Sequence, residues 1–379
     1  MIYLDHAAST SLSDEALDVL INSSREDFAN PSSSHKFGKS ILKKIEISRK
    51  LMLEFLKAGE LYDLYFTSSA TESNNTVIKG LEIGGRDVVF VSRSDHPSLQ
   101  KPVESLLNSH VNISYIPMKG DGSIDDITLK ELLSEDVKLV IFSHVNNQSG
   151  HICNVSKIAS EIKKSFEEIH IHVDGVQSFC KIPFSLKSGV IDSYSVASHK
   201  IGGAKGVAAL YLRKNSVLKP LLSGGGQEGG LRSSTHAAPL ILSFGEAVKY
   251  LSDMVDKNFQ YVKELNLKAR KFLEELIPNI IFPFSGEDIS PYILNLIIPG
   301  ISSDIIIRHL EEKSIFISST SACSSGGKEE NPVFKSLGIP VKYHNFVYRV
   351  SFSYKSKESE VKMFCETIAS IYGDLSDLL

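Results

Sequence analysis

Seven short apolar runs, rich in β-branched and aromatic residues, recur between residues 64 and 212 of the chain. Helical patterns such as Ser98–Asn108 and Ile158–Phe166 separate most of these runs. Strands that alternate with helices in this way form a largely parallel sheet with helices on both of its faces. The sequence therefore predicts an α/β fold around a mostly parallel seven-stranded sheet, whose strands are Leu64–Phe66, Val88–Val91, Ile113–Ile116, Leu139–Phe142, Ile169–Val173, Ser193–Val196 and Val207–Leu212.

The chain has 379 residues, which is more than one hydrophobic core usually supports, so we expect two domains. The large domain is predicted to comprise residues 15–250. A smaller α+β domain is predicted from residues 1–14 and 251–379. A long amphipathic pattern runs from Leu240 to about Ile277, with Pro278 after it, and predicts a helix that links the two domains.

The composition indicates a soluble enzyme that binds neither nucleic acid nor membranes. The formal net charge is −4 and no run of like charges occurs, so a surface for nucleic acid or anionic lipid is not expected. The amino terminus lacks the pattern of a signal peptide, and no apolar run reaches a membrane span of roughly 20 residues. The four cysteines lack metal-ligand spacing, which predicts a reducing compartment, the cytoplasm, and no metal site.

Lys200 is the first candidate for covalent chemistry. It follows a short apolar strand and precedes the glycine-rich turn Ile201–Gly206, so its amine can approach a bound ligand with little obstruction. A desolvated lysine of lowered pKa can form a Schiff base with a carbonyl cofactor such as pyridoxal 5'-phosphate. Most lysines in such a position are instead solvated loop residues, so a second residue is needed to distinguish a covalent site from an ordinary loop.

Asp174 supplies that second group. It follows the predicted strand Ile169–Val173, at the carboxyl edge where open α/β sheets bind ligands. A carboxylate there can keep the ring nitrogen of pyridoxal phosphate protonated, which makes the ring an electron sink. Alone, Asp174 could be an ordinary strand-end cap. With Lys200 at this spacing, it is typical of the cofactor site of aspartate aminotransferase-type enzymes.

The segment Phe66–Asn75 reads as a strand end, a turn of small residues and a helix start. The free N–H groups of a first helical turn, together with the helix dipole, bind phosphate. Ala70 and Thr71 are therefore candidate phosphate ligands. A capped helix without a ligand would have a similar sequence, and the lysine motif favours the phosphate site.

Polar side chains follow other predicted strand ends. His96 can stack on a planar cofactor and move protons near neutral pH. Asn147 and Gln177 can donate hydrogen bonds from their amides to a phenolic oxygen. Each of these residues alone could be incidental or a turn former, but several strand ends that converge on polar side chains favour a site.

Two loops add further candidates. The polar loop Leu222–Thr235 could be a simple linker, or it could bring Thr235 to a phosphate, including that of a partner subunit. The segment Ser318–Gly327 is a run of small residues around Cys323. An exposed thiol there is a candidate nucleophile if a positive neighbour promotes the thiolate. A stray surface cysteine is the simpler alternative.

Together these residues resemble the cysteine desulfurases, a branch of the class V aminotransferase family of fold-type-I pyridoxal-phosphate enzymes. The resemblance extends from Tyr3–Thr10 and Asn30–His35 to Arg349–Phe352, nearly the whole chain. The motifs that carry it are Ala-Thr-Glu-Ser-Asn-Asn, His-Val-Asn-Asn, Val-Asp-x-x-Gln-Ser, Ser-His-Lys and Ser-Ala-Cys-x-Ser. The loop around Cys323, about residues 318–330, resembles the long form found in the first subgroup.

The resemblance implies a role for each candidate. Lys200 would hold the cofactor as a Schiff base and move the α-proton of L-cysteine, and the Cys323 thiolate would attack the substrate sulfur to give alanine and a persulfide. Asn30 and Arg349 would bind the substrate carboxylate. The remaining groups would hold the cofactor: Asp174 at the ring nitrogen, His96 on the ring, Gln177 and Asn147 at the phenolic oxygen, and Ala70, Thr71, Ser198, His199 and Thr235 at the phosphate.

The chain departs from the family at several positions: the family usually has glutamate where Gln148 stands, glycine where Ser69 and Ser198 stand, and arginine where Gly229 stands. The resemblance implies a homodimer that supplies sulfur for iron–sulfur clusters or thiolated molecules through an acceptor such as a cluster scaffold. The alternatives are a selenocysteine lyase, a class V aminotransferase, which would not need Cys323, or a non-catalytic binding subunit. Because the chain ends soon after its last predicted helix, we expect the acceptor to dock around the Cys323 loop.

Overall fold

The computed structural model describes residues 1–319 and 331–376. Its largest sheet contains β2 (Tyr62–Thr67), β3 (Val88–Val91), β4 (Asn112–Tyr115), β5 (Val137–Ser143), β6 (His170–Asp174), β7 (Ser193–Ala197) and β8 (Ala208–Arg213). The strand order is β2–β8–β7–β6–β5–β3–β4, and the neighbouring strands are parallel except where β8 meets β2 and β7. All seven predicted strands lie in this sheet, so the mostly parallel α/β fold is confirmed.

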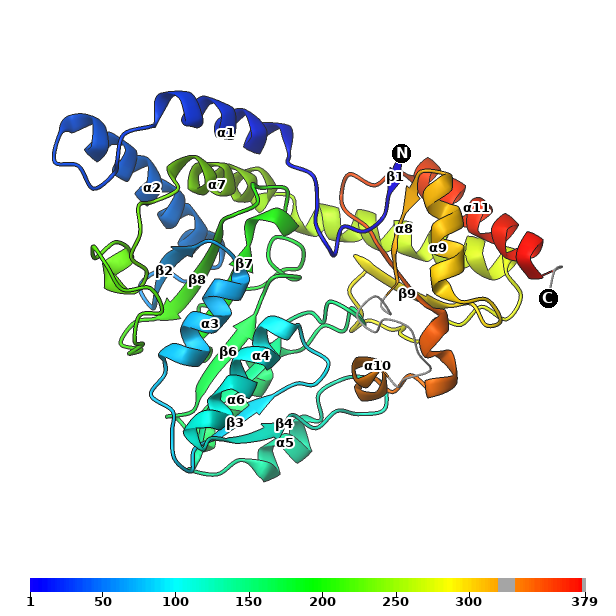
Figure 1. Ribbon diagram of the computed structural model, residues 1–379, viewed down its shortest axis with the longest axis horizontal. Helices are drawn as coiled ribbons and strands as arrows, with labels where there is room; N and C mark the ends of the chain where they lie inside the picture. Colours follow the sequence, from blue (N-terminus) through cyan, green and yellow to red (C-terminus); the bar gives the residue numbers. More distant parts are fainter. Residues whose placement is uncertain (320–330, 377–379) are drawn as a thin grey trace.

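Alternating residues of β5 show that both faces of the sheet are buried. Val140 and Phe142 pack in one hydrophobic cluster, and Leu139 and Ile141 pack in another, because successive side chains of a strand point to opposite faces. Helices cover both faces (Figure 1). The Leu139 cluster includes residues of α3 (Ala70–Gly80) and α4 (Pro97–Ser105), and the other cluster includes residues of α1 (Asp14–Glu26), α2 (Lys36–Phe55), α5 (Asp126–Leu132), α6 (Val155–Ser165) and α7 (Ala238–Ser252).

The helix expected over Leu240–Ile277 is two helices, α7 and α8 (Val255–Leu276). The chain leaves helical geometry at Asp253, where φ is −90° and ψ is 0°, and a new helix begins after Met254. Apolar residues of α7 pack beneath the large sheet, whereas those of α8 join a separate core. The prediction of one helix was wrong because two apolar faces have to enter two different cores.

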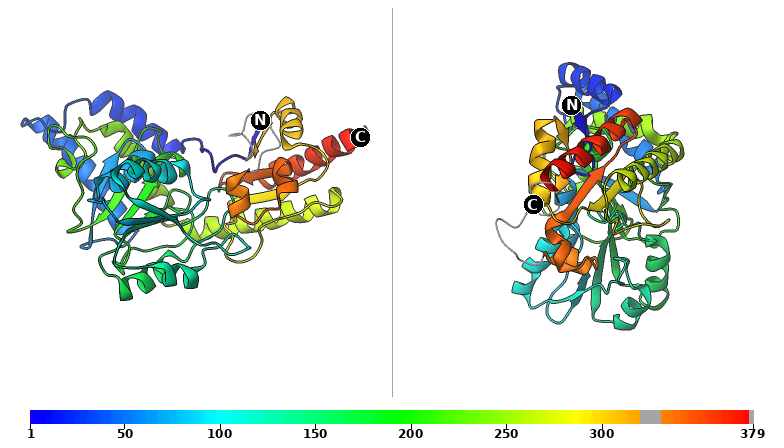
Figure 2. Two further views of the ribbon diagram at one scale, coloured as in Figure 1. Left: turned by 60° about the horizontal axis from the view of Figure 1, so that its bottom comes forward. Right: turned by 90° about the vertical axis from the view of Figure 1, so that its right-hand side faces the viewer.

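A second group of elements lies beside α8 (Figure 2). It contains β1 (Ile2–Tyr3), β9 (Ile293–Ile297), β10 (Ile315–Phe316), β11 (Ser318–Ser319), β12 (Val347–Ser351), α9 (Ser303–Glu312), α10 (Pro332–Ser336) and α11 (Glu358–Ser376). Strands β11, β12 and β9 form an antiparallel sheet, and β1 pairs with β10 in parallel. The first residues of the chain therefore join its carboxyl-terminal part, where α11 packs along α8.

The two helices predicted between strands are present as α4, which a short 3-10 helix extends over Leu106–Ser109, and as α6. No helix within residues 1–319 and 331–376 is long and apolar enough to cross a membrane. The same residues contain no group of three or more His, Cys, Asp or Glu side chains that could hold a metal ion.

Candidate active site

A cavity of about 350 Å³ opens at the carboxyl ends of β5, β6 and β7. This is the edge of a parallel sheet at which ligands bind. The amino-terminal segment and β12, which belong to the second group of elements, also line the cavity. Most of the predicted site residues line it: Ala70, Thr71, His96, Asn147, Asp174, Gln177, His199, Lys200 and Arg349.

Lys200 ends a short 3-10 helix, Ser198–Lys200, that follows β7. Its Nζ donates hydrogen bonds to the carbonyl oxygens of Ala7 (2.5 Å) and Ala8 (2.7 Å) in the amino-terminal segment. Burial, and then the neighbouring Arg349 cation, lower the pKa of Lys200 to about 8. Part of the amine is therefore neutral near pH 8, and the neutral amine is the nucleophilic form.

Asp174 is the buried last residue of β6. One carboxylate oxygen accepts the N–H of Val176 (2.9 Å), and the other accepts the side-chain amide of Asn74 (3.0 Å). Burial raises the pKa of Asp174, and these two donors, with His96 and Lys200, act in the opposite direction. The carboxylate has room for one more donor, such as a protonated ring nitrogen in the cavity.

The amino terminus of α3 forms one wall of the cavity. Ser69 caps the helix by accepting a hydrogen bond from the N–H of Glu72 (3.1 Å). Ala70 and Thr71 occupy the first two helical positions, whose N–H groups have no acceptor within a helix. These N–H groups and the helix dipole suit a phosphate.

Two histidines line the cavity. His96 caps α4, because its Nδ1 accepts the N–H of Ser98 (3.1 Å) and lies 2.8 Å from the Ser98 hydroxyl. Burial lowers the pKa of His96. Burial, and then the Lys200 cation, lower the pKa of His199 to about 4. Both rings are therefore neutral at pH 7.

A buried lysine that the sequence analysis missed supports Gln177. Lys181 Nζ donates to Gln177 Oε1 (3.2 Å), and Gln177 Nε2 donates to the carbonyl oxygen of Ala7 (2.8 Å). No carboxylate in the described part of the chain pairs with Lys181, and burial, followed by the Lys200 cation, lowers its pKa to about 7. The only signal for Lys181 in the sequence is its position four residues after Gln177.

Arg349 reaches the cavity from β12. Its Nη2 forms an ion pair with Asp5 (3.1 Å), another residue that the sequence analysis missed, and its Nη1 donates to the carbonyl oxygen of Asn147 (3.0 Å). Arg349 Nε and Asn147 Oδ1 are buried and have no hydrogen-bond partner among the described residues. Orphan polar atoms in a cavity are expected to bind a polar ligand.

Two of the predicted ligands do not line this cavity. Ser198 is fully buried, and its Oγ occupies the space into which a side chain at Gly203 would project, so it faces away from the cavity. Ala197 lines the cavity in its place. Asn30 is exposed, and its side chain accepts the N–H of Ser32 (2.9 Å). Neither Ser198 nor Asn30 therefore contributes to the cavity of its own chain.

One other predicted residue, Thr235, is not brought to this cavity. Thr235 lines a separate cavity of about 210 Å³, and its assignment to a partner's phosphate stays a prediction. Cys323 lies outside the described residues. In the loop before Thr235, Gly229 has a φ of 62°, a left-handed conformation in which the arginine usual for the family would be strained.

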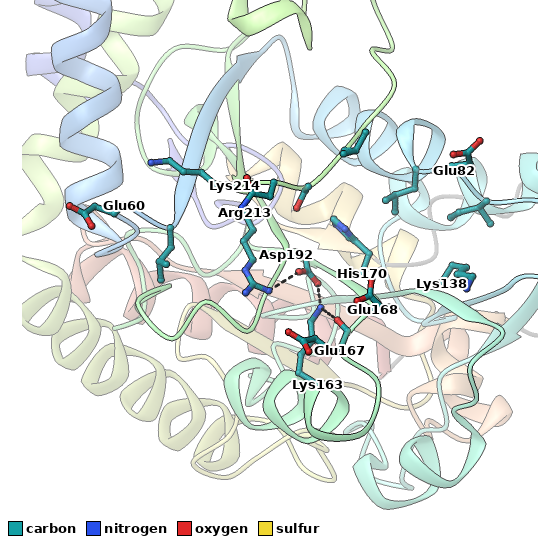
Figure 3. A pocket seen from close by; sticks show the side chains of 16 residues that line it. Glu60, Glu82, Lys138, Lys163, Glu167, Glu168, His170, Asp192, Arg213 and Lys214 are labelled. Atoms are coloured by element: carbon teal, nitrogen blue, oxygen red, sulfur yellow. Dashed lines mark hydrogen bonds and ion pairs between the residues drawn. The ribbon is translucent and has the colours of Figure 1, made fainter.

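A larger cavity of about 690 Å³ lies at the opposite ends of the strands (Figure 3). Its buried Asp192 forms ion pairs with Lys163 (2.8 Å) and Arg213 (3.5 Å) and accepts the N–H of Ile171 (2.8 Å). These charges satisfy one another, and the predicted catalytic residues Lys200 and His96 line the smaller cavity instead. We therefore take the smaller cavity as the active site.

Comparison with known proteins agrees with this geometry. The family model described as Aminotransferase class-V matches residues 2–364. The chain is 32% identical to the NifS/IcsS protein homolog of Lactobacillus delbrueckii subsp. bulgaricus, over 100% of this chain and 99% of that protein. It is 31% identical to the cysteine desulfurase IscS of Dictyoglomus turgidum, over 90% and 86% of the two chains. A solved NifS-like protein has a TM-score of 0.91 at 28% identity, over 98% of this chain and 99% of that one.

A lysine and an aspartate at the carboxyl edge of such a sheet, beside a helix amino terminus, define a fold-type-I pyridoxal-phosphate enzyme. Within that class, the chain belongs to the aminotransferase class-V family. This family depends on pyridoxal phosphate, and the similar proteins named above include a cysteine desulfurase. The family resemblance seen in the sequence is thereby confirmed.

Proposed function

We propose that the protein is a pyridoxal-phosphate-dependent cysteine desulfurase, which converts L-cysteine to L-alanine and leaves the sulfur as a persulfide on Cys323. The observation that carries the proposal is the joint placement of Lys200, Asp174 and Arg349 in one cavity. These side chains supply an amine, a carboxylate and a guanidinium. These three groups suit an amino acid that is bound through pyridoxal phosphate.

The cavity residues fit pyridoxal phosphate. Lys200, with its pKa near 8, would hold the aldehyde carbon covalently. Asp174 would face the ring nitrogen, His96 would cover the ring, and the N–H groups of Ala70 and Thr71 would hold the phosphate. When bound, the cofactor supplies an electron sink for the α-carbon of the substrate.

Arg349 would bind the substrate carboxylate. Asp5 and the Asn147 carbonyl fix two of its nitrogens, and Nε keeps an unused proton. A charge-assisted hydrogen bond from a fixed guanidinium orients a carboxylate well. Lys200 would then move the α-proton, since its amine is partly neutral near pH 8.

Cys323 would take the sulfur. Its thiolate would form an S–S bond while the bond between the substrate sulfur and its β-carbon breaks. The electron pair would remain on carbon, which takes up a proton to become the methyl group of alanine. Ser318 pairs with Arg349 across β11 and β12, so the segment that leads toward Cys323 in the sequence starts beside the strand that carries Arg349.

We also propose that the protein is a cytoplasmic homodimer. It would pass its sulfur to an acceptor protein such as a cluster scaffold. Phe28, 77% exposed, stacks edge to face on Phe37 of α2. Leu42, further along α2, lines a cavity with the loop over 225–229. We infer that the partner covers these apolar groups, and Thr235 in the adjoining loop would then serve the partner's phosphate.

The proposed function is tested by incubating the protein, reconstituted with pyridoxal phosphate, with L-cysteine and a thiol reductant. We expect alanine and sulfide in equal amounts. L-selenocysteine serves as a comparison substrate, and a strong preference for it would identify a selenocysteine lyase instead. Turnover that requires a keto acid would identify an aminotransferase. Absence of alanine from both substrates would contradict both lyase activities.

A further inference from the structure

Asn74 connects residues of the cavity but has no role in the function proposed so far. It lies in α3 and is fully buried. Its Nδ2 donates hydrogen bonds to Ser98 Oγ (2.9 Å) and to Asp174 Oδ2 (3.0 Å). Its Oδ1 accepts from Ser195 Oγ (2.7 Å) and from His172 Nε2 (3.0 Å). The amide therefore uses all four of its hydrogen-bonding positions.

The carboxylate of Asp174 decides which way the Asn74 amide points. An ionised carboxylate accepts hydrogen bonds and cannot donate them. Its other oxygen already accepts the N–H of Val176 (2.9 Å). The nitrogen of the Asn74 amide must therefore face Asp174, and the same NH₂ group donates to Ser98.

Two buried histidines on the other side of Asn74 agree with this orientation. Burial lowers the pKa of His172 to about 3 and that of His170 to about 4, so both rings are neutral at pH 7. Because neutral His172 donates to Asn74 from Nε2, its Nδ1 accepts from the Ser193 hydroxyl (2.8 Å). Ser193 Oγ in turn accepts from His170 Nε2 (2.7 Å). This chain of hydrogen bonds ends at His170 in the wall of the larger cavity (Figure 3).

Through Ser98, the same amide helps to set where His96 carries its proton. Because Ser98 Oγ accepts from Asn74, the Ser98 hydroxyl proton can donate to His96 Nδ1, 2.8 Å away. The backbone N–H of Ser98 donates to the same ring nitrogen (3.1 Å). A nitrogen that accepts two hydrogen bonds carries no proton, so the neutral ring is protonated on Nε2.

We propose that Asn74 is a positioning residue that holds the Asp174 carboxylate directly and, through Ser98, keeps the proton of His96 on Nε2. The inference rests on the proposed function only in taking these residues as the active site. The charged groups that face His96 are Asp174 and Lys200. Protonation at Nδ1 would cost two hydrogen bonds, which adds to burial in keeping the ring neutral.

Nitrogen-15 spectra of the full chain, labelled in histidine and reconstituted with pyridoxal phosphate, test the proposal. The His96 signals are identified by their absence in His96→Gln. We expect the Nε2–H form in the wild-type protein. In Ser98→Ala, the midpoint of His96 protonation should rise by roughly half to one pH unit, because one of two donors to Nδ1 is lost.

Two variants serve as controls. Ser98→Thr keeps a hydroxyl and should restore the wild-type midpoint. Ser105→Ala removes a hydroxyl of the same helix that bonds to the Pro102 carbonyl (2.6 Å), and should leave the His96 midpoint unchanged. Asn74→Leu removes the donor that orients the Ser98 hydroxyl and should also raise the midpoint, but by no more than Ser98→Ala, because both Ser98 donors to Nδ1 remain.

A wild-type His96 with its proton on Nδ1 would overturn the proposal, and so would an unchanged midpoint in Ser98→Ala. If Asn74→Leu does not fold, the Ser98 variants decide the question. The spectra do not depend on turnover. A protein that released no alanine from L-cysteine would therefore refute the proposed function without altering this result.

Discussion

Lys181 Nζ lies 3.2 Å from the side-chain oxygen of Gln177, so a buried lysine stands directly behind a residue of the cavity. Burial, and then the Lys200 cation, lower the pKa of Lys181 from 10.5 to about 7. Between these pH values the unfolded chain holds a proton on this side chain that the folded protein lacks. The linkage between proton binding and folding therefore makes this lysine destabilising below about pH 7, and the penalty decreases as the pH rises.

Lys181→Met removes this titration. The free energy of unfolding of the wild type, minus that of the variant, should increase between about pH 7 and pH 10, by at most about 1.4 kcal/mol per pH unit. Denaturant titrations at several pH values measure it. Lys205→Met is the matched control, because Lys205 is exposed, and should show no such trend. A difference that stays constant across this window would contradict the account.

Lys200→Ala should abolish the covalent attachment of pyridoxal phosphate, because the other buried amine near the cavity among the described residues, Lys181, is directed at Gln177. Borohydride reduction followed by mass spectrometry measures the attachment. Lys205→Ala should be labelled like the wild type. A cofactor adduct of undiminished yield in Lys200→Ala would show that another residue forms the link.

Arg349→Ala should mainly weaken substrate binding. Loss of a charge-assisted partner of a carboxylate costs about 1.5–3 kcal/mol, so the KM for L-cysteine should rise roughly ten- to a hundredfold. Steady-state kinetics separate this effect from kcat. Arg349→Lys keeps the positive charge but loses the bidentate geometry of the guanidinium, so its KM should lie between that of the wild type and that of Arg349→Ala. An unchanged KM in Arg349→Ala would assign the arginine a purely structural role with Asp5.

Ser198→Ala should stabilise the protein. The Ser198 hydroxyl is buried without a partner among the described residues, so its removal should raise the free energy of unfolding by about 1 kcal/mol. The affinity for pyridoxal phosphate should stay unchanged, because the side chain faces Gly203 and not the cavity. Weaker cofactor binding in this variant would restore the original assignment of Ser198 to the phosphate.

The sequence predicted the sheet and most of the residues that line the smaller cavity for one physical reason. Apolar runs identify buried strands, and polar residues such as Asp174 and Lys200 at their carboxyl ends must meet at one edge. The break between α7 and α8 could not be predicted, because it depends on which core each apolar face enters. The direction of the Ser198 side chain and the contact between Lys181 and Gln177 likewise depend on tertiary packing.

The contacts of Asn74 and Asp5 could not be predicted from the sequence for a related reason. Each is an ordinary residue of a motif, and its partners are distant in the chain: Asn74 bonds to Asp174, and Asp5 pairs with Arg349. Hydrogen bonds over such separations leave no local pattern in the sequence. Only the fold brings these residues together.

The most direct test of the proposed chemistry is the mass of the Cys323 peptide after a single turnover with L-cysteine, measured under conditions that preserve persulfides. We expect one added sulfur atom on Cys323 and one alanine released per active site. The Lys200→Ala protein should show neither, and Cys323→Ser should still bind the cofactor but release no sulfide above background. An unmodified Cys323 peptide, or a persulfide on Cys153 or Cys180, would contradict the assignment of Cys323 as the sulfur acceptor.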